Sequence, residues 1–221
     1  MPRLTIDFVS DVVCPWCVIG LRGLEIAVDR IDDLDVDIRL HPFELNPAMG
    51  REGQDVAEHI HEKYGATAEQ SAATRETIRQ RGADVGMTMA SGPGGRIYNS
   101  FDCHRLLTWA AEQGQALALK HALFAAYFTD RRDISDPDVL VEVVRATGLD
   151  GERARAILAS DDYAAQVRTE EQRWRSEGVT SVPTIIIEER YVISGGQPPE
   201  AFERALRQIA QEVAARRATA S

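Results

Sequence analysis

Two cysteines three positions apart, in the run Cys14-Pro15-Trp16-Cys17, are the residues best suited to chemistry. Such a pair can exchange disulfides, but only a thiolate attacks, so the protein must favour the charged form of one cysteine and leave it reachable. We expect Cys14 to be exposed just before a helix, whose unpaired N–H groups and dipole favour an anion. Cys17, one turn later, would face Cys14 and resolve a mixed disulfide. Pro15 would stiffen the ring that the two sulfurs close, and Trp16 would add apolar cover without charge.

The same spacing also occurs in zinc ribbons and knuckles, so metal binding is the first alternative. A four-ligand zinc site needs two further donors, and Cys103 with the adjacent His104 is the only plausible pair. Adjacent side chains rarely converge on one metal ion. We therefore expect no metal at this site, and we keep a non-catalytic module that binds zinc or a partner as an alternative.

A second feature lies far along the chain, where Val182 and Pro183 come immediately before the β-branched run from Thr184 to Ile187. In a thioredoxin fold, Pro183 would follow a cis peptide bond and lie against the two cysteines. The alternative is an ordinary trans proline at the start of a strand. A cis bond at this position would therefore place Pro183 beside the Cys14 to Cys17 motif.

Hydrophobic periodicity predicts the elements that position the cysteines. Apolar residues alternate with polar ones over residues 4–8 and again over 36–40, which is typical of strands. Between them, apolar residues recur every three or four positions over 21–31, as on one face of a helix. Pro15 suits the first turn of that helix, where its missing N–H costs nothing. A β-α-β unit is therefore complete by about residue 42.

The C-terminal part carries a second set of strand and helix signals. Residues 184–187 and 191–193 read as two strands joined in a hairpin. Two prolines, 198 and 199, then open a final helix. One face of that helix is apolar and is formed by Phe202, Leu206, Ile209 and Val213.

The middle of the chain shows helical patterns only. From about residue 46 to 178 no convincing strand is found, and about six helical segments are separated by turns such as the loop 91–95. This order predicts an α/β, thioredoxin-like fold (β-α-β … β-β-α) with a large inserted all-helical domain. We place the thioredoxin-like domain at residues 1–45 and 178–221, and the inserted helical domain at 46–177.

Composition excludes several classes of protein. The 221 residues are 44% hydrophobic and 27% charged, which is typical of globular chains. The formal net charge of -10, with acidic residues scattered among arginines, argues against a nucleic-acid partner. No segment approaches the roughly 18 to 20 consecutive apolar residues that span a bilayer, and the N-terminus lacks the apolar core of a signal peptide. We expect a cytoplasmic protein without a membrane partner.

The joint pattern resembles the DsbA-like family and, within it, the FrnE-type subgroup. The resemblance covers nearly the whole chain and rests on the Cys14 to Cys17 motif, the long helical insert, and the runs 178–184 and 194–197. It implies that Cys14 is the nucleophile, Cys17 the resolving thiol and Pro183 the cis-proline. The preceding Val182 would present its backbone to an extended substrate. Because Trp16 stands where secreted members commonly have histidine, their strongly oxidising role is not implied.

Around residues 99–105 the chain resembles a helix start common in this subgroup. Cys103 is either a buried core thiol, the interpretation we favour, or a regulatory or substrate-facing thiol. Asn99 and His104 line a cleft between the domains, or else act simply as a helix cap and a partly exposed helical histidine.

We interpret the chain as a DsbA-like protein disulfide oxidoreductase that exchanges a Cys14–Cys17 dithiol or disulfide with protein or small-molecule disulfides. It needs no cofactor, although glutathione is a candidate co-substrate. The main alternative is a glutathione-dependent isomerase or transferase, similar to the 2-hydroxychromene-2-carboxylate isomerases and the kappa-class transferases, which typically have serine at the first active position. The apolar stretch from Leu117 to Phe128 belongs either to the core or to a homodimer interface.

Overall fold

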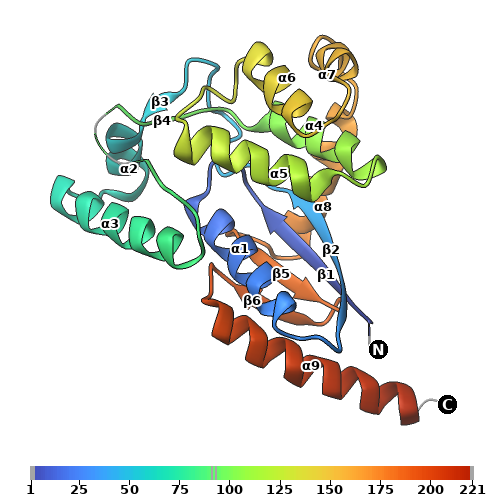
Figure 1. The fold of residues 1–221 in the computed structure, drawn as a ribbon. Coiled ribbons are helices and arrows are strands. Elements are labelled where there is room, and N and C mark those ends of the chain that lie inside the picture. The colour runs from blue at the N-terminus through green and yellow to red at the C-terminus, as the bar shows by residue number, and fades with distance from the viewer. Residues whose placement is uncertain (1–2, 91, 93, 220–221) are drawn as a thin grey trace.

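The computed structural model describes residues 3–90, 92 and 94–219 (Figure 1). Positions 1–2 and 220–221 of the predicted thioredoxin-like domain lie outside the described residues. So do positions 91 and 93 of the predicted loop 91–95.

A four-stranded sheet in the order β2-β1-β5-β6 forms the centre of the fold. Its strands are β1 (Arg3–Ser10), β2 (Asp35–Pro42), β5 (Thr184–Ile187) and β6 (Tyr191–Ser194). β2 runs parallel to β1 and β5 runs antiparallel to it, so that Ile6 of β1 is paired with Ile38 on one side and Ile187 on the other. The two ends of the chain therefore meet at β1, and the predicted β-α-β and β-β-α units are confirmed.

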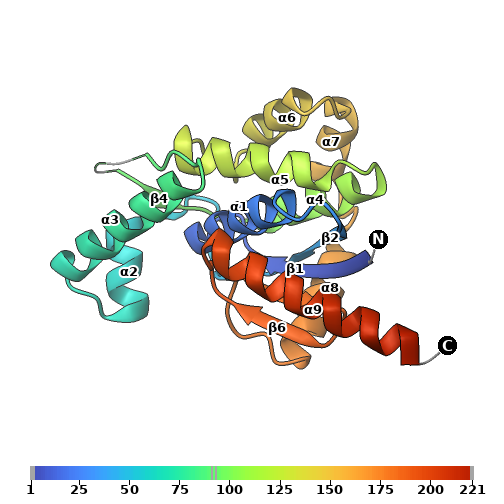
Figure 2. The ribbon, with the colours of Figure 1, turned by 60° about the horizontal axis from the view of Figure 1, so that its bottom comes forward.

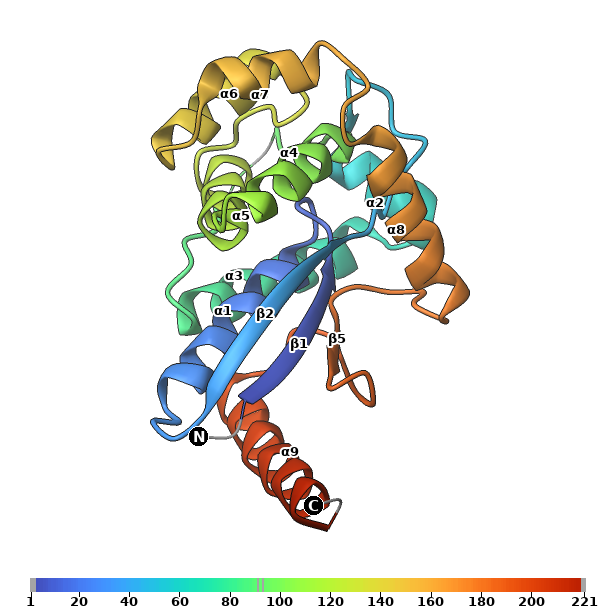
Figure 3. The ribbon, with the colours of Figure 1, turned by 90° about the vertical axis from the view of Figure 1, so that its right-hand side faces the viewer.

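Helices cover both faces of the sheet. α1 (Pro15–Asp29) connects β1 to β2 and packs beside the C-terminal helix α9 (Pro199–Thr219). α8 (Ala164–Ser176) packs against β2. Figures 2 and 3 show α8 on the opposite side of β1 and β2 from α1. This layering buries β1 on both faces, and β1 leads directly into the cysteine motif.

The segment between β2 and β5 contains seven of the described α-helices, from α2 to α8. Besides α8 they are α2 (Val56–Tyr64), α3 (Ala68–Asp84), α4 (Phe101–Glu112), α5 (Ala116–Phe124), α6 (Pro137–Ala146) and α7 (Gly151–Leu158). A π-helical turn, Ala125–Thr129, extends α5. The helical character predicted for this segment is confirmed, with one helix more than the expected six.

The expectation that this segment contains no strand is wrong in one detail. β3 (Gln54–Asp55) and β4 (Arg96–Ile97) form a small antiparallel sheet. Each strand has two residues, which is too short for a period-2 pattern to be visible in the sequence. The pairing also joins segments about forty positions apart, so only the folded chain creates it.

One continuous hydrophobic core runs from the sheet into the helical segment. It includes Phe8 and Leu24 near the cysteines, and Leu106 and Phe124 from α4 and α5. The apolar face predicted for the last helix is buried at Phe202, Leu206, Ile209 and Val213. Among the described residues, no helix combines the length and apolar composition that crossing a membrane requires.

Leu206 provides a test of how much the α9 contact stabilises the fold. Its side chain is fully buried, so Leu206→Ala should lower the free energy of unfolding by about 2–5 kcal/mol. Val192 on the edge strand β6 is 63% exposed, and Val192→Ala should change stability by less than about 0.5 kcal/mol. Urea unfolding followed by circular dichroism measures both. An equal decrease in the free energy of unfolding of the two variants would contradict the packing of α9 described above.

Candidate active site

Cys14 is the N-cap residue of α1, with extended backbone (φ -91°, ψ 115°), and Pro15 is the first helical residue. The Cys14 N–H donates to the carbonyl of Asp11 at 3.3 Å, and the Cys17 N–H donates to the carbonyl of Cys14 at 3.0 Å. The first turn of α1 carries no acidic residue that would oppose a negative charge at Cys14. The predicted relation between the motif and the helix is therefore confirmed.

The expectation that Cys14 is exposed is wrong. Its exposed fraction is 3%, Cys17 is completely buried, and both are free thiols. The reason is the loop before β5, whose Val182 carbonyl accepts a hydrogen bond from the Cys14 thiol at 3.6 Å. A partner disulfide therefore has to displace the Val182 carbonyl from the Cys14 thiol.

The loop before β5 places a proline against the active-site helix. The Val182–Pro183 peptide bond is cis, as predicted. A Cβ atom at Gly20 of α1 would lie 3.0 Å from Cγ of Pro183, closer than most side chains allow. Glycine at this position therefore permits Pro183 to lie on the helix that carries both cysteines.

The loop after β6 approaches the same helix. A Cβ atom at Gly196 would lie 2.7 Å from the carbonyl oxygen of Trp16, a distance that real Cβ atoms do not show. Only glycine fits there, which gives the run from Ser194 to Gln197 a structural role at the motif. Val182, Pro183 and Gly196 thus all lie next to the Cys14 to Cys17 turn.

Cys17 and Lys120 form a buried pair of ionisable groups beneath the motif. Burial raises the pKa of Cys17 well above its usual value, the neighbouring Cys14 raises it further, and the charge of Lys120 lowers it. Lys120 comes from α5 and is 1% exposed, and burial lowers its pKa. Its ammonium lies 5.2 Å from the ring centroid of Phe124. The buried ammonium therefore offsets part of the rise in the Cys17 pKa.

Asp11 and His104 form a second buried polar contact at the motif. The Nε2 atom of His104 lies 3.4 Å from Oδ1 of Asp11, and the other carboxylate oxygen accepts the Leu45 N–H at 2.7 Å. Burial alone would raise the pKa of Asp11, but the interaction with His104 and the Leu45 hydrogen bond hold it below its usual value. Of the two alternatives for His104, the partly exposed helical histidine is wrong, because α4 packs this residue against Asp11 and leaves it 2% exposed.

Three polar side-chain atoms in the described part of the chain are buried without a hydrogen-bond partner. They are Ser10 Oγ, Glu44 Oε1 and His104 Nε2. Burial and the nearby Glu171 raise the pKa of Glu44, whereas Arg168 and His104 lower it. Ser10 ends β1, Glu44 lies just after β2, and His104 belongs to α4. Buried polar atoms without a partner therefore occur at the ends of the two strands and in the helix α4.

The structure decides between the alternative roles of Asn99 and of Cys103. The Asn99 side chain accepts the Phe101 N–H at 2.9 Å and donates to the Met49 carbonyl at 2.9 Å, so it organises the start of α4. Cys103 is fully buried, its thiol donates to the Ile134 carbonyl at 3.4 Å, and burial raises its pKa. It is a core thiol, as favoured from the sequence.

Asp11, Glu44 and Lys120 were not identified as site residues from the sequence. Lys120 lies inside the apolar stretch 117–128, which packs in the core of this chain through Leu119, Leu123 and Phe124. A single lysine in such a stretch was the signal that a buried charge was present.

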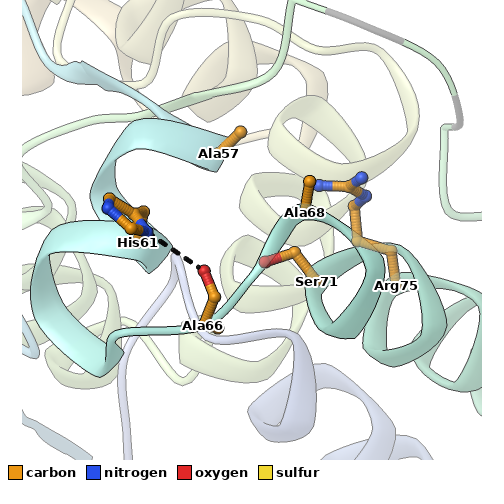
Figure 4. Close-up of a pocket in the computed structure, with 6 residues that line it drawn as sticks. All are labelled: Ala57, His61, Ala66, Ala68, Ser71 and Arg75. Carbon is orange, nitrogen blue, oxygen red and sulfur yellow. Dashed lines mark hydrogen bonds between the residues drawn. The ribbon is translucent and has the colours of Figure 1, made fainter.

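No group of three or more His, Cys, Asp or Glu side chains in the described residues could hold a metal ion. A pocket of about 190 Å³ lies between α2 and α3 (Figure 4). It is lined by Ala57, His61, Ala66, Ala68, Ser71 and Arg75, and neither cysteine of the motif contributes to it. A groove of about 260 Å³ follows α1 between Ile19, Arg81 and Gly196 and so begins near Trp16.

The model of the family described as DSBA-like thioredoxin domain matches residues 5–207. A curated relative, protein YwbO of Bacillus subtilis, whose function is uncharacterised, is 27% identical over 198 residues, covering 89% of this chain and 92% of its own.

Solved structures show the same likeness. A probable DsbA oxidoreductase from Streptomyces coelicolor is 34% identical, with a TM-score of 0.86 over 95% of this chain and 90% of its own. The cytosolic disulfide reductase DsbM from Pseudomonas aeruginosa, solved with GSH, shares the fold at 20% identity and a TM-score of 0.62, covering 94% of this chain and 99% of its own. A 2-hydroxychromene-2-carboxylate isomerase shares it at 15% identity and a TM-score of 0.71, covering 95% of this chain and 98% of its own.

Cys14 should be the first thiol to react with iodoacetamide near neutral pH. The raised pKa values of Cys17 and Cys103 keep both as thiols, whereas Cys14 lies at a helix N-terminus that favours the thiolate. Peptide mass spectrometry over a time course identifies the order of labelling, and Cys14→Ser should remove the fast phase. Faster labelling of Cys103 would contradict the assignment.

Proposed function

Because the chain belongs to the DSBA-like thioredoxin domain family, to which its family match and its 34% identical relative assign it, we propose that Cys14 and Cys17 form its redox-active dithiol. The activity proposed is protein disulfide oxidoreduction. The observation that carries the proposal is the position of Cys14 at the N-terminus of α1, in contact with the carbonyl that precedes cis-Pro183.

In the reducing direction, the Cys14 thiolate attacks one sulfur of a substrate disulfide. A Cys14–substrate disulfide forms, and the other substrate sulfur leaves as a thiolate that takes up a proton. Cys17 then loses its proton and attacks Cys14 Sγ, which releases the second substrate thiol and leaves a Cys14–Cys17 disulfide. Two electrons pass to the substrate. The oxidising direction follows the same steps in reverse.

The buried charges support the second step. Cys17 has to lose a proton in an environment that raises its pKa, and the charge of Lys120 opposes that effect. We assign Lys120 the role of stabilising the Cys17 thiolate. Val182 and Pro183 would hold an extended substrate, with the Val182 carbonyl freed from the Cys14 thiol once the mixed disulfide forms.

Glutathione is proposed as a co-substrate that reduces the Cys14–Cys17 disulfide by the same exchange. A glutathione-dependent isomerase or transferase is the alternative, and it predicts that activity survives in Cys14→Ser, because relatives of that type carry serine there. Assignment to the FrnE-type subgroup, a cytoplasmic location and a homodimer stay predictions.

Replacing Cys17 with serine should trap covalent adducts on Cys14. The resolving thiol is then missing, so the mixed disulfide formed with a peptide disulfide should accumulate. Intact-mass spectrometry under non-reducing conditions measures the adduct, and Cys103→Ser, which leaves the pair intact, serves as the matched control. A Cys17→Ser variant that forms no adduct would contradict dithiol exchange.

Replacing Lys120 with methionine should make the protein more stable and the resolving step slower. Because burial lowers the pKa of Lys120, removal of its charge should raise the free energy of unfolding at pH 7. The folded-state pKa of Lys120 is lowered, so its burial costs stability below that pKa, and this cost disappears as pH rises toward about 10.4, the usual unfolded-state value.

The stability gain of Lys120→Met should therefore be greatest at neutral pH and shrink in alkali. Because the Cys17 thiolate loses a stabilising charge, release of the mixed disulfide should slow roughly tenfold. Urea unfolding between pH 7 and 10 and stopped-flow kinetics measure the two effects. A variant that is more stable but resolves at the wild-type rate would remove Lys120 from the mechanism.

A further inference from the structure

The helical hairpin formed by α2 and α3 lies beside the N-terminal end of α1 (Figures 1 and 2). α3 contacts α1, and its end lines the groove along that helix. Few residues of the hairpin are buried: His59 in α2, and Ser71 and Gly82 in α3. The hairpin therefore contributes a surface next to the active-site turn and little to the core.

Tyr64, the last residue of α2, is the conspicuous side chain of this surface. It is 61% exposed and, with Val192, is one of two large hydrophobic side chains exposed in the described part of the protein. Its hydroxyl has no hydrogen-bond partner among the described residues, and the Lys63 ammonium lies 5.6 Å from its ring centroid. The fold itself makes little use of the ring.

A short chain of hydrogen bonds connects the end of α2 to the reactive cysteine. The Lys63 ammonium donates to the Leu45 carbonyl at 2.9 Å, and the Leu45 N–H donates to the Asp11 carboxylate at 2.7 Å. The Asp11 carbonyl in turn accepts the Cys14 N–H at 3.3 Å. Tyr64 follows Lys63 in the chain and ends α2, the helix that these bonds tie to the active-site loop.

The electrostatics of the ring agree with this placement. Burial of part of the side chain raises the pKa of the Tyr64 hydroxyl, and the electrostatic interaction with Cys14 raises it further. A partly exposed aromatic ring beside a deeply set nucleophile is suited to hold a group that projects from the substrate.

We propose that Tyr64 is a substrate-contacting residue that binds an apolar or aromatic side chain next to the disulfide of a polypeptide substrate. This inference rests on the proposed function and names its substrate class. Cys14 is buried beneath the Val182 carbonyl, and Tyr64 comes from a different element. A substrate that reaches Cys14 and Tyr64 together must therefore extend beyond its disulfide, which a polypeptide does and a small disulfide does not.

The test compares two substrates and three variants. The substrates are a peptide disulfide with phenylalanine beside one cysteine and the small compound bis(2-hydroxyethyl) disulfide. The variants are Tyr64→Ala, Tyr64→Phe and Val192→Ala, the last being matched in exposure but located on the edge strand β6. Reduction is followed with glutathione as the electron donor, and kcat/KM is measured for each pair.

Tyr64→Ala should lower the ratio of peptide to small-disulfide kcat/KM roughly tenfold, chiefly through KM for the peptide, since the lost contact is made by bound substrate. Tyr64→Phe should restore the ratio, because the ring and not the hydroxyl makes the contact. Val192→Ala should leave it unchanged.

An unchanged ratio in Tyr64→Ala would overturn the inference while leaving the proposed function standing. An equal loss of kcat/KM for both substrates in Tyr64→Ala would also overturn it, because Tyr64 would then act on Cys14 rather than on the substrate. Wild-type protein that reduces neither compound would overturn the proposed function first, and the inference with it.

Discussion

Gly20 and Gly196 allow two loops to lie directly on the first turns of α1, and the environment of the reactive thiol depends on that packing. One loop brings Pro183 onto Gly20, and the other lies on the carbonyl of Trp16. Both loops flank the β5–β6 hairpin, so the pairing of β5 with β1 determines where they meet the helix. A Cβ atom at Gly196 would force its loop away from α1, and one at Gly20 would press on the Pro183 ring. The contact between the Cys14 thiol and the Val182 carbonyl would then be weakened.

The helical segment between β2 and β5 completes this site rather than merely covering it. α5 carries the buried Lys120, whose charge acts on Cys17, and α4 carries His104 to within 3.4 Å of Asp11. Charges in such a place are costly to bury, so they persist where they influence a reacting group or are well paired. Because one core extends from the sheet into these helices, a change in their packing would alter the charge around the dithiol.

α8 links the helical segment back to the sheet and leads into the loop that carries Pro183. His41 of β2 lies between two carboxylates, with one ring nitrogen 2.8 Å from Asp7 and the other 2.8 Å from Glu170 of α8. Its ring centroid is 4.7 Å from that of Trp174. These contacts hold α8 on the face of the sheet opposite α1. The segment 177–183, which connects α8 to β5 and carries Pro183, therefore begins at a fixed position on the sheet.

The sequence by itself determined the local features of this protein. Helical periodicity and Pro15 placed Cys14 at a helix N-terminus, and a β-branched run placed a strand directly after Pro183, because such signals depend on neighbouring residues. The position of Pro183 beside the motif followed only from the expected thioredoxin-like fold. Only the tertiary structure decided burial. Cys14 is covered, His104 is internal, and Lys120 is buried where its charge acts on Cys17, because segments roughly 90 to 170 positions apart in sequence pack together. No local pattern specifies which distant segment will exclude water from a given side chain.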